Sequence, residues 1–169
     1  MKAIDVLGIT VLFFAVSLHL TGCGDGVTPN LSKQAEIQDR ETLLGVISKV
    51  VGTYSGTVKN NPDGSEDFPI SLELYTVEEP NGVNEAGEAK FRPSLRGRYR
   101  RTDFPLDGTT DKSLSGRYYQ ENGVVTLFSS NTQTEKGYVS ITANFIDNQL
   151  KGQLRNQQGV QGDFTLVRK

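Results

Sequence analysis

The sequence feature that most constrains the fold is a glycine repeated at the centre of short alternating segments. Five segments share the pattern apolar-x-Gly-x-apolar: residues 54–58, 95–99, 114–118, 150–154 and 160–164. Because side chains alternate along a β-strand, each glycine faces the same side as its two apolar neighbours. Small residues beside large ones suit the tapering interior of a small closed barrel. The repeat therefore favours a closed barrel, with a sandwich of two sheets as the alternative.

Alternation with a period of two continues through the chain after residue 50. Clusters of Gly, Pro, Asn and Asp separate the alternating runs, and Asn122-Gly123 is the sharpest hairpin signal among them. Mostly tight turns predict antiparallel order, and pairing of the first strand with the last would remove both exposed edges. We therefore predict an all-β fold, an eight-stranded antiparallel up-and-down barrel, with strands at 51–59, 68–78, 90–101, 114–120, 124–130, 138–146, 150–155 and 160–168.

A different period precedes the strands. Ile37, Leu44, Ile47 and Val51 recur at helical spacing. We predict one α-helix over residues 34–48, packed as a lid or base on the barrel.

Acidic residues gather in the segment 77–89, which contains Glu78, Glu79, Glu85 and Glu88. We expect a long polar hairpin loop there, with a cation site or a mobile lip of the barrel as the alternatives. Asp107 and Asp111 match no calcium-loop spacing, and the chain has no phosphate-loop or zinc motif. The sequence therefore predicts no metal and no cofactor.

The N-terminus carries an apolar run from Val6 to Leu20, with one basic residue, Lys2, ahead of it. The run holds about 15 residues, fewer than the roughly 20 of a membrane-spanning helix, and suits the apolar core of a signal peptide. Its end, Leu20-Thr21-Gly22-Cys23, resembles the lipobox of bacterial lipoproteins. That resemblance implies cleavage before Cys23 and diacylglycerol on its sulfur. A spanning helix and an ordinary secretory signal are the alternatives.

This resemblance implies three parts in the chain. They are a lipoprotein signal peptide at 1–22, a lipidated N-terminus and flexible tether at 23–33, and a helix-plus-barrel domain at 34–169. It also implies a lipid-anchored protein of the bacterial cell envelope, bound to membrane lipid through Cys23. Lipoproteins held at the inner membrane often carry Asp after the cysteine, whereas this chain has Gly24, so an outer membrane is favoured if the host has two membranes.

The mature chain would contain no histidine, because the only one, His19, lies in the signal peptide. Acylation of Cys23 would also occupy the only thiol. These absences exclude Ser-His and Cys-His nucleophiles and histidine-rich metal sites, and a net charge of −2 argues against nucleic acid. We expect a non-enzymatic monomer with a single domain. A glycosidase with paired carboxylates is an alternative that one sequence leaves open.

A helix, then a Gly-x-aromatic strand, then an eight-stranded meander resembles the lipocalin and calycin-type barrels. The matching positions are Gly52-Thr53-Tyr54 in the first strand and Arg168 in the last. In that family a basic residue of the last strand covers the aromatic ring of the first. The aromatic residue here is tyrosine instead of tryptophan, and the family's middle motifs are missing. The resemblance therefore implies the architecture more than a ligand.

The barrel interior is one candidate binding site. A barrel of eight strands can be filled by side chains or can hold one small ligand, and five inward glycines leave more room than five leucines would. The leading function is therefore binding of a small apolar or amphiphilic ligand inside the barrel. The alternative is a packed barrel that serves as an envelope scaffold or accessory subunit. The candidate lining residues are Tyr54, Leu72, Leu74, Phe91, Leu95, Tyr99, Tyr118, Phe145 and Phe164.

Four arginines form a second candidate site. Arg92, Arg96, Arg98 and Arg100 are spaced by even numbers, so they share the outer face of one strand. They could bind an anionic envelope component. They could also pair with neighbours such as Glu73, and exposed pairs of that kind contribute only about 0–1 kcal/mol each.

Overall fold

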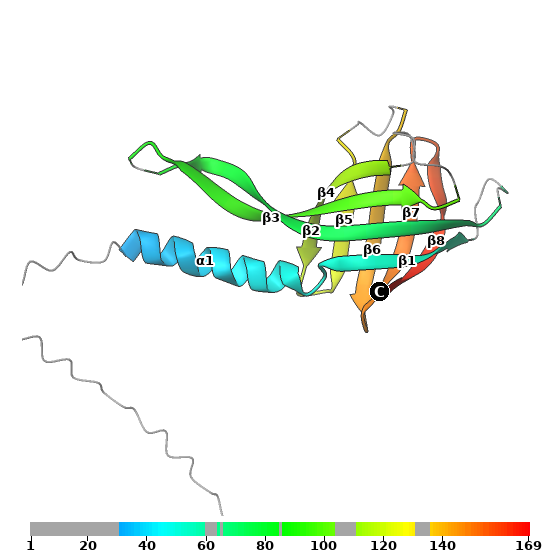
Figure 1. The fold of residues 1–169 in the computed structure, drawn as a ribbon, viewed down its shortest axis with the longest axis horizontal. Helices are drawn as coiled ribbons and strands as arrows, with labels where there is room; N and C mark the ends of the chain where they lie inside the picture. The colour runs from blue at the N-terminus through cyan, green and yellow to red at the C-terminus, as the bar shows by residue number, and fades with distance from the viewer. Residues whose placement is uncertain (1–30, 60–63, 65, 85, 104–110, 131–135) are drawn as a thin grey trace, which may run out of the picture.

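A computed structural model describes residues 31–59, 64, 66–84, 86–103, 111–130 and 136–169. One helix, α1 (Leu31–Ser48), precedes eight strands. The helix and part of one hairpin project from one end of a barrel (Figure 1). The strands are β1 (Gly52–Lys59), β2 (Phe68–Val83), β3 (Ala89–Arg101), β4 (Asp111–Tyr119), β5 (Val124–Phe128), β6 (Val139–Ile146), β7 (Gln149–Asn156) and β8 (Gly159–Arg168).

The sheet is a closed barrel in which every strand pairs with its neighbours in sequence order. All pairs are antiparallel, and β1 closes the sheet by pairing with β8 from Tyr54↔Arg168 to Lys59↔Asp163. The predicted fold class is therefore confirmed, and the sandwich of two sheets is excluded. The architecture is consistent with a calycin-like fold.

The prediction of a loop over residues 77–89 was wrong. Strand β2 continues to Val83, and β3 begins at Ala89. The hairpin ladder includes Val77↔Ser94 and Glu79↔Arg92, with an irregularity between Pro80 and Val83. Glu78 pairs with Arg40 and Glu79 pairs with Arg96, and pairs of opposite charge across strands stabilise an antiparallel sheet. These pairs offset the repulsion expected among the glutamates.

The barrel core is built from large apolar side chains of the strands. Large residues with less than 2% of their surface exposed include Ile70, Leu72, Leu74, Leu95, Leu114, Leu127, Ile141, Leu150 and Leu166. They belong to one hydrophobic cluster that also includes Tyr54, Tyr99 and Phe164. These side chains therefore pack against one another inside the barrel.

The inward glycines allow strands and side chains to come close together. A Cβ atom at Gly56 would lie 2.2 Å from the carbonyl oxygen of Thr165, and one at Gly116 would lie 2.3 Å from a methyl carbon of Leu127. At Gly152 the nearest atom, a backbone oxygen, would be 2.0 Å away. The space above these glycines is occupied, so they do not enlarge the interior as their count had indicated.

The helix covers one end of the barrel with its last turns. Ile47 and the following Val50 are buried in the core cluster, whereas residues 34–42 are exposed. The helix starts at Leu31, three residues before the predicted start, and Ile37 is 50% exposed instead of packed. Within the part of the chain that is described, no helix is long and apolar enough to span a membrane.

Arg168 joins the helix to the barrel. Its guanidinium lies 5.9 Å from the ring centre of Tyr54 and donates hydrogen bonds to the carbonyl oxygens of Val51 and Lys49. A Cβ at Gly52 would lie 2.6 Å from Nε of Arg168. The arginine therefore covers the aromatic ring of the first strand, as the resemblance to calycin barrels implied.

Burial changes the titration of Tyr99. Loss of solvent around the hydroxyl raises its pKa well above the ordinary 10.0, and nearby Arg101 only partly opposes this shift. The folded protein therefore holds the proton above the pH at which the unfolded chain releases it. This contribution to stability is complete below about pH 10 and falls as the pH rises further, by about 1.4 kcal/mol per pH unit for one group.

We expect urea denaturation between pH 9 and 11.5 to show this loss of stability. Tyr99→Phe removes the ionising group and should flatten the decline. Tyr119→Phe is the matched control, because Tyr119 is 36% exposed. Equal slopes for the wild type and Tyr99→Phe would contradict the assignment.

Candidate functional site

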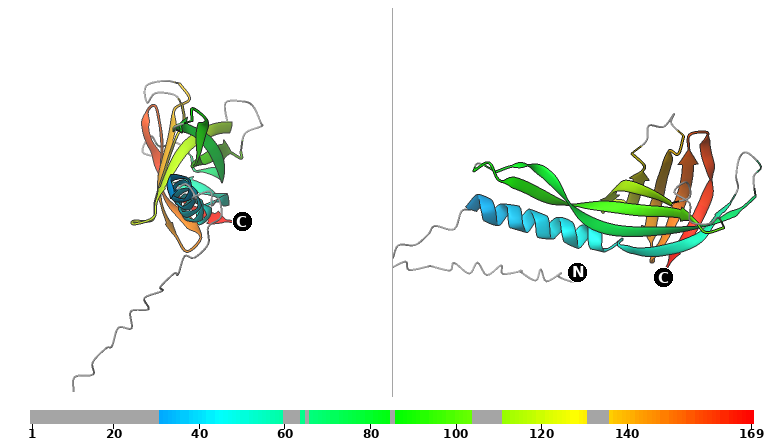
Figure 2. Two further views of the ribbon diagram at one scale, coloured as in Figure 1. Left: turned by 90° about the vertical axis from the view of Figure 1, so that its left-hand side faces the viewer. Right: turned by 45° about the horizontal axis from the view of Figure 1, so that its top comes forward.

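The main surface feature is an arm that extends beyond the barrel. We define the arm as α1 together with residues 75–83 of β2 and 89–94 of β3. Pairing of β1 with β2 ends at Leu74, and pairing of β3 with β4 ends at Leu95. The hairpin beyond these residues pairs only with itself and lies alongside α1 (Figure 2). An isolated two-stranded hairpin is marginal in water, so contact with the helix is part of its support.

Two ion pairs connect the helix to the hairpin. Arg40 pairs with Glu78, and Glu36 pairs with Lys90. The four side chains are between 35% and 51% exposed, so each pair contributes only about 0–1 kcal/mol. The two pairs hold the helix beside the hairpin and leave a groove between them.

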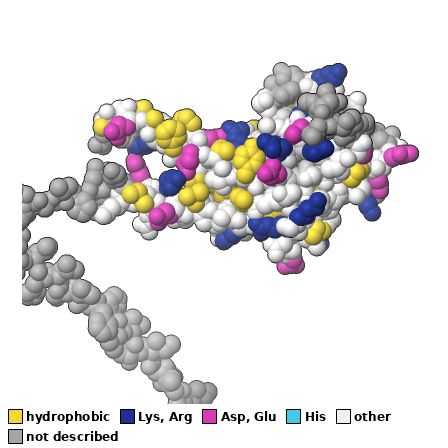
Figure 3. Space-filling model, viewed as in Figure 1, with side chains coloured by type: hydrophobic (Ala, Val, Ile, Leu, Met, Phe, Trp, Pro, Cys, Tyr) yellow, Lys and Arg dark blue, Asp and Glu magenta, His cyan; other side chains and the backbone are white. Residues whose placement is uncertain are grey.

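A groove with a volume of about 770 Å³ lies between the helix and the hairpin. Its apolar surface is unusually open: Ile37 is 50% exposed and Phe91 is 54% exposed. Hydrophobic side chains gather on the arm in the space-filling view (Figure 3). The main apolar lining residues are Ile37, Leu43, Val46, Ala89 and Phe91.

The groove continues into a wedge between β3 and β4. Strand β3 leaves β4 after the pair Leu95↔Gly116, two residues from Pro93, which has no N–H to donate to a neighbouring strand. The wedge encloses about 430 Å³ and shares Leu43 and Arg92 with the groove. Together they form one continuous site along α1.

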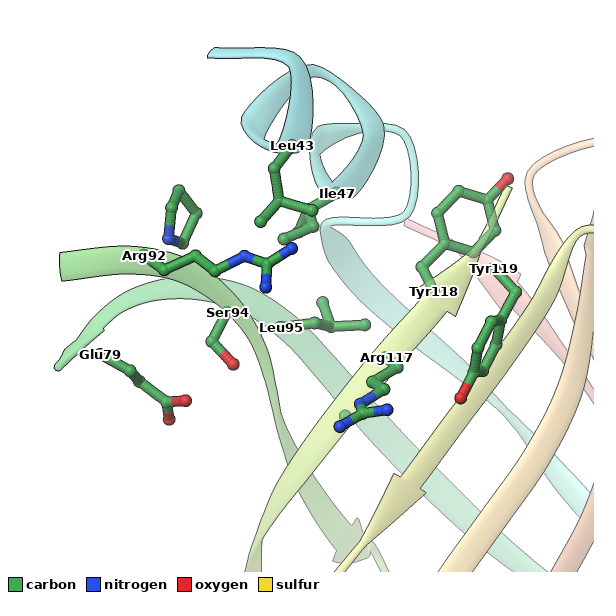
Figure 4. Close-up of a pocket in the computed structure, with 11 residues that line it drawn as sticks. Leu43, Ile47, Glu79, Arg92, Ser94, Leu95, Arg117, Tyr118 and Tyr119 are labelled. Carbon is green, nitrogen blue, oxygen red and sulfur yellow. The ribbon is translucent and has the colours of Figure 1, made fainter. Parts of the chain in front are cut away.

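The wedge combines an apolar floor with a basic rim. Leu43 and Ile47 descend from the helix over Leu95 (Figure 4). The guanidinium group of Arg92 lies beside Ile47, and that of Arg117 lies on the far side of Leu95. Within the described residues neither guanidinium group has a hydrogen bond or an ion pair. The rim therefore offers two positive charges that are available to a ligand.

The arginine row lies on the outer face of β3, as predicted, but its members differ. Arg96 pairs with Glu79 and donates to the hydroxyl of Ser115. Arg98 lies 3.5 Å from Glu73 and 4.0 Å from Asp111. Nε of Arg100 is buried with no hydrogen-bond partner among the described residues. Of the four, Arg92 alone lines the wedge and the groove.

The predicted interior residues also divide into groups. Tyr54, Leu72, Leu74, Leu95, Tyr99 and Phe164 are buried in the core. Phe91 was wrongly placed there, because its strand has already left the barrel at that point. Tyr118 and Phe145 are partly buried against the core, with their rings 6.3 Å apart and edge to face. The lipidation residue, Cys23, and the signal peptide and tether up to residue 30 lie outside the described residues.

The sequence did not identify Ile37, Leu43 or Arg117 as site residues. Helical spacing indicated only that Ile37 and its neighbours share a face, and no motif singled out Arg117. The signal that could have found the groove is the shared alternation of β2 and β3 beyond residue 77. That alternation places Phe91 on the continuation of the inner face.

Neither a metal centre in the described part of the chain nor a known family assigns this protein to a class. Among the described residues, no group of three His, Cys, Asp or Glu side chains is placed to hold a metal ion. No protein-family model matches the chain, and no curated protein matches it. The fold and site define the class as an eight-stranded up-and-down barrel with a groove outside the barrel, along its N-terminal helix.

Proposed function

We propose that this protein is a lipid-anchored, non-enzymatic binding protein of the bacterial envelope that holds an amphiphilic ligand in the groove and wedge along α1. The observation that carries this proposal is the continuous site outside the barrel, which has an open apolar surface and two unpaired arginines. Ligand sites in proteins are concave and mostly apolar, with few polar groups that fix orientation. The inner face of the barrel is a less suitable location, because its large side chains are buried against one another.

The position of the helix supports an anchor near the groove. α1 begins at Leu31, so seven residues separate it from Cys23 in the sequence. The chain from Cys23 to Leu31 can span at most about 28 Å. The outer end of the arm is the start of α1 (Figure 1). An acylated Cys23 would therefore hold the groove close to the membrane, where amphiphiles are concentrated.

A second candidate function is favoured by the packing of the barrel. A filled interior and a projecting arm suit an envelope scaffold or accessory subunit that binds a protein partner. Val83 is 66% exposed on this arm, and exposed apolar residues that cluster mark interaction sites. This candidate predicts that the protein carries no small molecule.

Mass spectrometry of the protein produced in a bacterium tests both the anchor and the cargo. We expect the full chain to lose residues 1–22 and to gain acyl mass at Cys23. Cys23→Ser, with residues 1–22 replaced by a cleavable secretory signal, should lose both the acyl mass and the membrane fraction. The lipid-free Cys23→Ser protein, incubated with a lipid extract, should then show a discrete added mass in native spectra that solvent removes. Phe91→Ser should reduce this uptake several-fold.

Phe128→Ser is the matched control for the groove, because Phe128 is a phenylalanine of similar exposure, 48%, on β5. It should leave uptake unchanged. A clean apo mass after incubation would reject the ligand proposal and favour the scaffold. An unmodified Cys23 would reject the anchor independently.

A further inference from the structure

We infer that the ligand is a single-chain amphiphile with an anionic headgroup, with its head in the wedge and its tail in the groove. This inference rests on the proposed function and adds the chemistry and the orientation of the ligand. Its basis is the difference between the two ends of the site. The wedge end carries unpaired arginines, whereas the groove end has an exposed apolar surface.

The wedge end of the site selects for negative charge. Arg92 and Arg117 reach it from two different strands, and neither is neutralised by a described partner. Among the described lining residues of the wedge, the one carboxylate belongs to Glu79, and Arg96 already pairs with it. Guanidinium groups bind carboxylates and phosphates through paired hydrogen bonds. An anionic head in the wedge would therefore be attracted by two cations that no described side chain neutralises.

The groove end selects for an apolar chain. Three of its charged residues, Glu36, Arg40 and Lys90, are engaged in the ion pairs that connect helix and hairpin. Asp39 also lines the groove, and Arg92 lines it where it meets the wedge. Between these pairs the exposed surface belongs to Ile37 and Phe91. A tail that covers them gains about 25 cal/mol for each Å² of apolar surface removed from water.

The dimensions suit one chain. Ile37 and Ile47 line opposite ends of the site, ten residues apart on α1, which is about 15 Å along a helix. An extended chain of about a dozen carbons has this length. A phospholipid with two chains would leave one of them outside the groove, so a single chain fits the site better.

Four probes with the same twelve-carbon chain test the inference: dodecanoate, dodecyl phosphate, dodecanol and dodecyltrimethylammonium. Titration of the mature Cys23→Ser chain below the micellar concentration of each probe gives the affinities. We expect the two anions to bind at least tenfold more tightly than dodecanol, and the cation to bind most weakly. Stronger binding of the phosphate would point to a phosphorylated lipid, and stronger binding of the carboxylate to a fatty acid.

The variant Arg92→Gln/Arg117→Gln should reduce the affinity for both anions to that for dodecanol and leave dodecanol binding unchanged. Arg155→Gln, an exposed arginine on β7, is the control and should keep the preference. Methyl NMR should show shifts at Ile37, Leu43 and Ile47, with little change at the interior residues Leu72 and Leu150.

Equal affinity for all four probes, or a preference that survives in the double variant, would overturn the anionic head while leaving the proposed binding function in place. Shifts confined to Leu72 and Leu150 would overturn the location. Absence of saturable binding by every probe would reject the proposed function as well.

Discussion

We expect Gly152→Ala to destabilise the barrel by about 3 kcal/mol or more, the upper end of the cost of inserting atoms into a packed core. The added Cβ would lie 2.0 Å from the carbonyl oxygen of Thr142 and 2.5 Å from Cα of Ala143. Both are backbone atoms of β6, the strand that pairs with β7. The methyl group can be accommodated only if the two strands separate, which weakens their ladder.

A series of alanine variants separates this effect from the general cost of replacing glycine. At Gly116 the closest atom is the end of the Leu127 side chain, which can rotate away, so Gly116→Ala should cost less than Gly152→Ala. At Gly45, in α1, nothing lies within 4 Å, and alanine should stabilise the helix by about 0.5–1 kcal/mol. Urea denaturation gives the order directly. If Gly152→Ala were as stable as the wild type, close strand approach would not explain the glycine repeat.

The glycine repeat shows what the sequence could predict and what it could not. A period of two and the turn residues fix the number and order of strands, because both are local properties of the chain. The space above each glycine depends on the neighbouring strand: Thr165 lies over Gly56, and Leu127 lies over Gly116. That contact is made between residues distant in sequence. The same pattern is therefore compatible with an open interior or a filled one.

The candidate site was harder to predict than the fold, because it is formed by residues that are far apart in the sequence. Glu78 and Glu79 look like part of a repelling acidic loop until Arg40 on the helix and Arg96 on β3 pair with them. These cations allow the segment to continue as a strand and to leave the barrel. The groove exists because two elements far apart in sequence then run side by side. Helical periodicity could place Ile37 on a face, but it could not show that the face is only half covered.

We expect Arg168→Ala to destabilise the protein by about 3 kcal/mol, a sum of the usual values for hydrogen bonds from a charged group and for a cation–π contact. The guanidinium donates to Val51 and Lys49 and also lies 3.3 Å from Oδ1 of Asn148. Its loss leaves carbonyl groups without a donor at the junction of α1 and β1, and it uncovers the ring of Tyr54. Arg168→Lys should restore only part of the stability, because an ammonium group cannot make the same planar set of contacts.

The arrangement around Gly52 gives this prediction a specific second test. Gly52→Ala places a methyl group against Arg168 and also strains a backbone with φ of 152°. In the Arg168→Ala background the collision disappears while the strain stays. A double-mutant cycle by urea denaturation should therefore show a smaller cost of Gly52→Ala in that background. Purely additive effects would mean that the arginine does not occupy the space above Gly52.

The contacts of Arg168 also hold α1 against the barrel. We therefore expect the backbone amides in the last turns of α1 to exchange with solvent faster in Arg168→Ala than in the wild type.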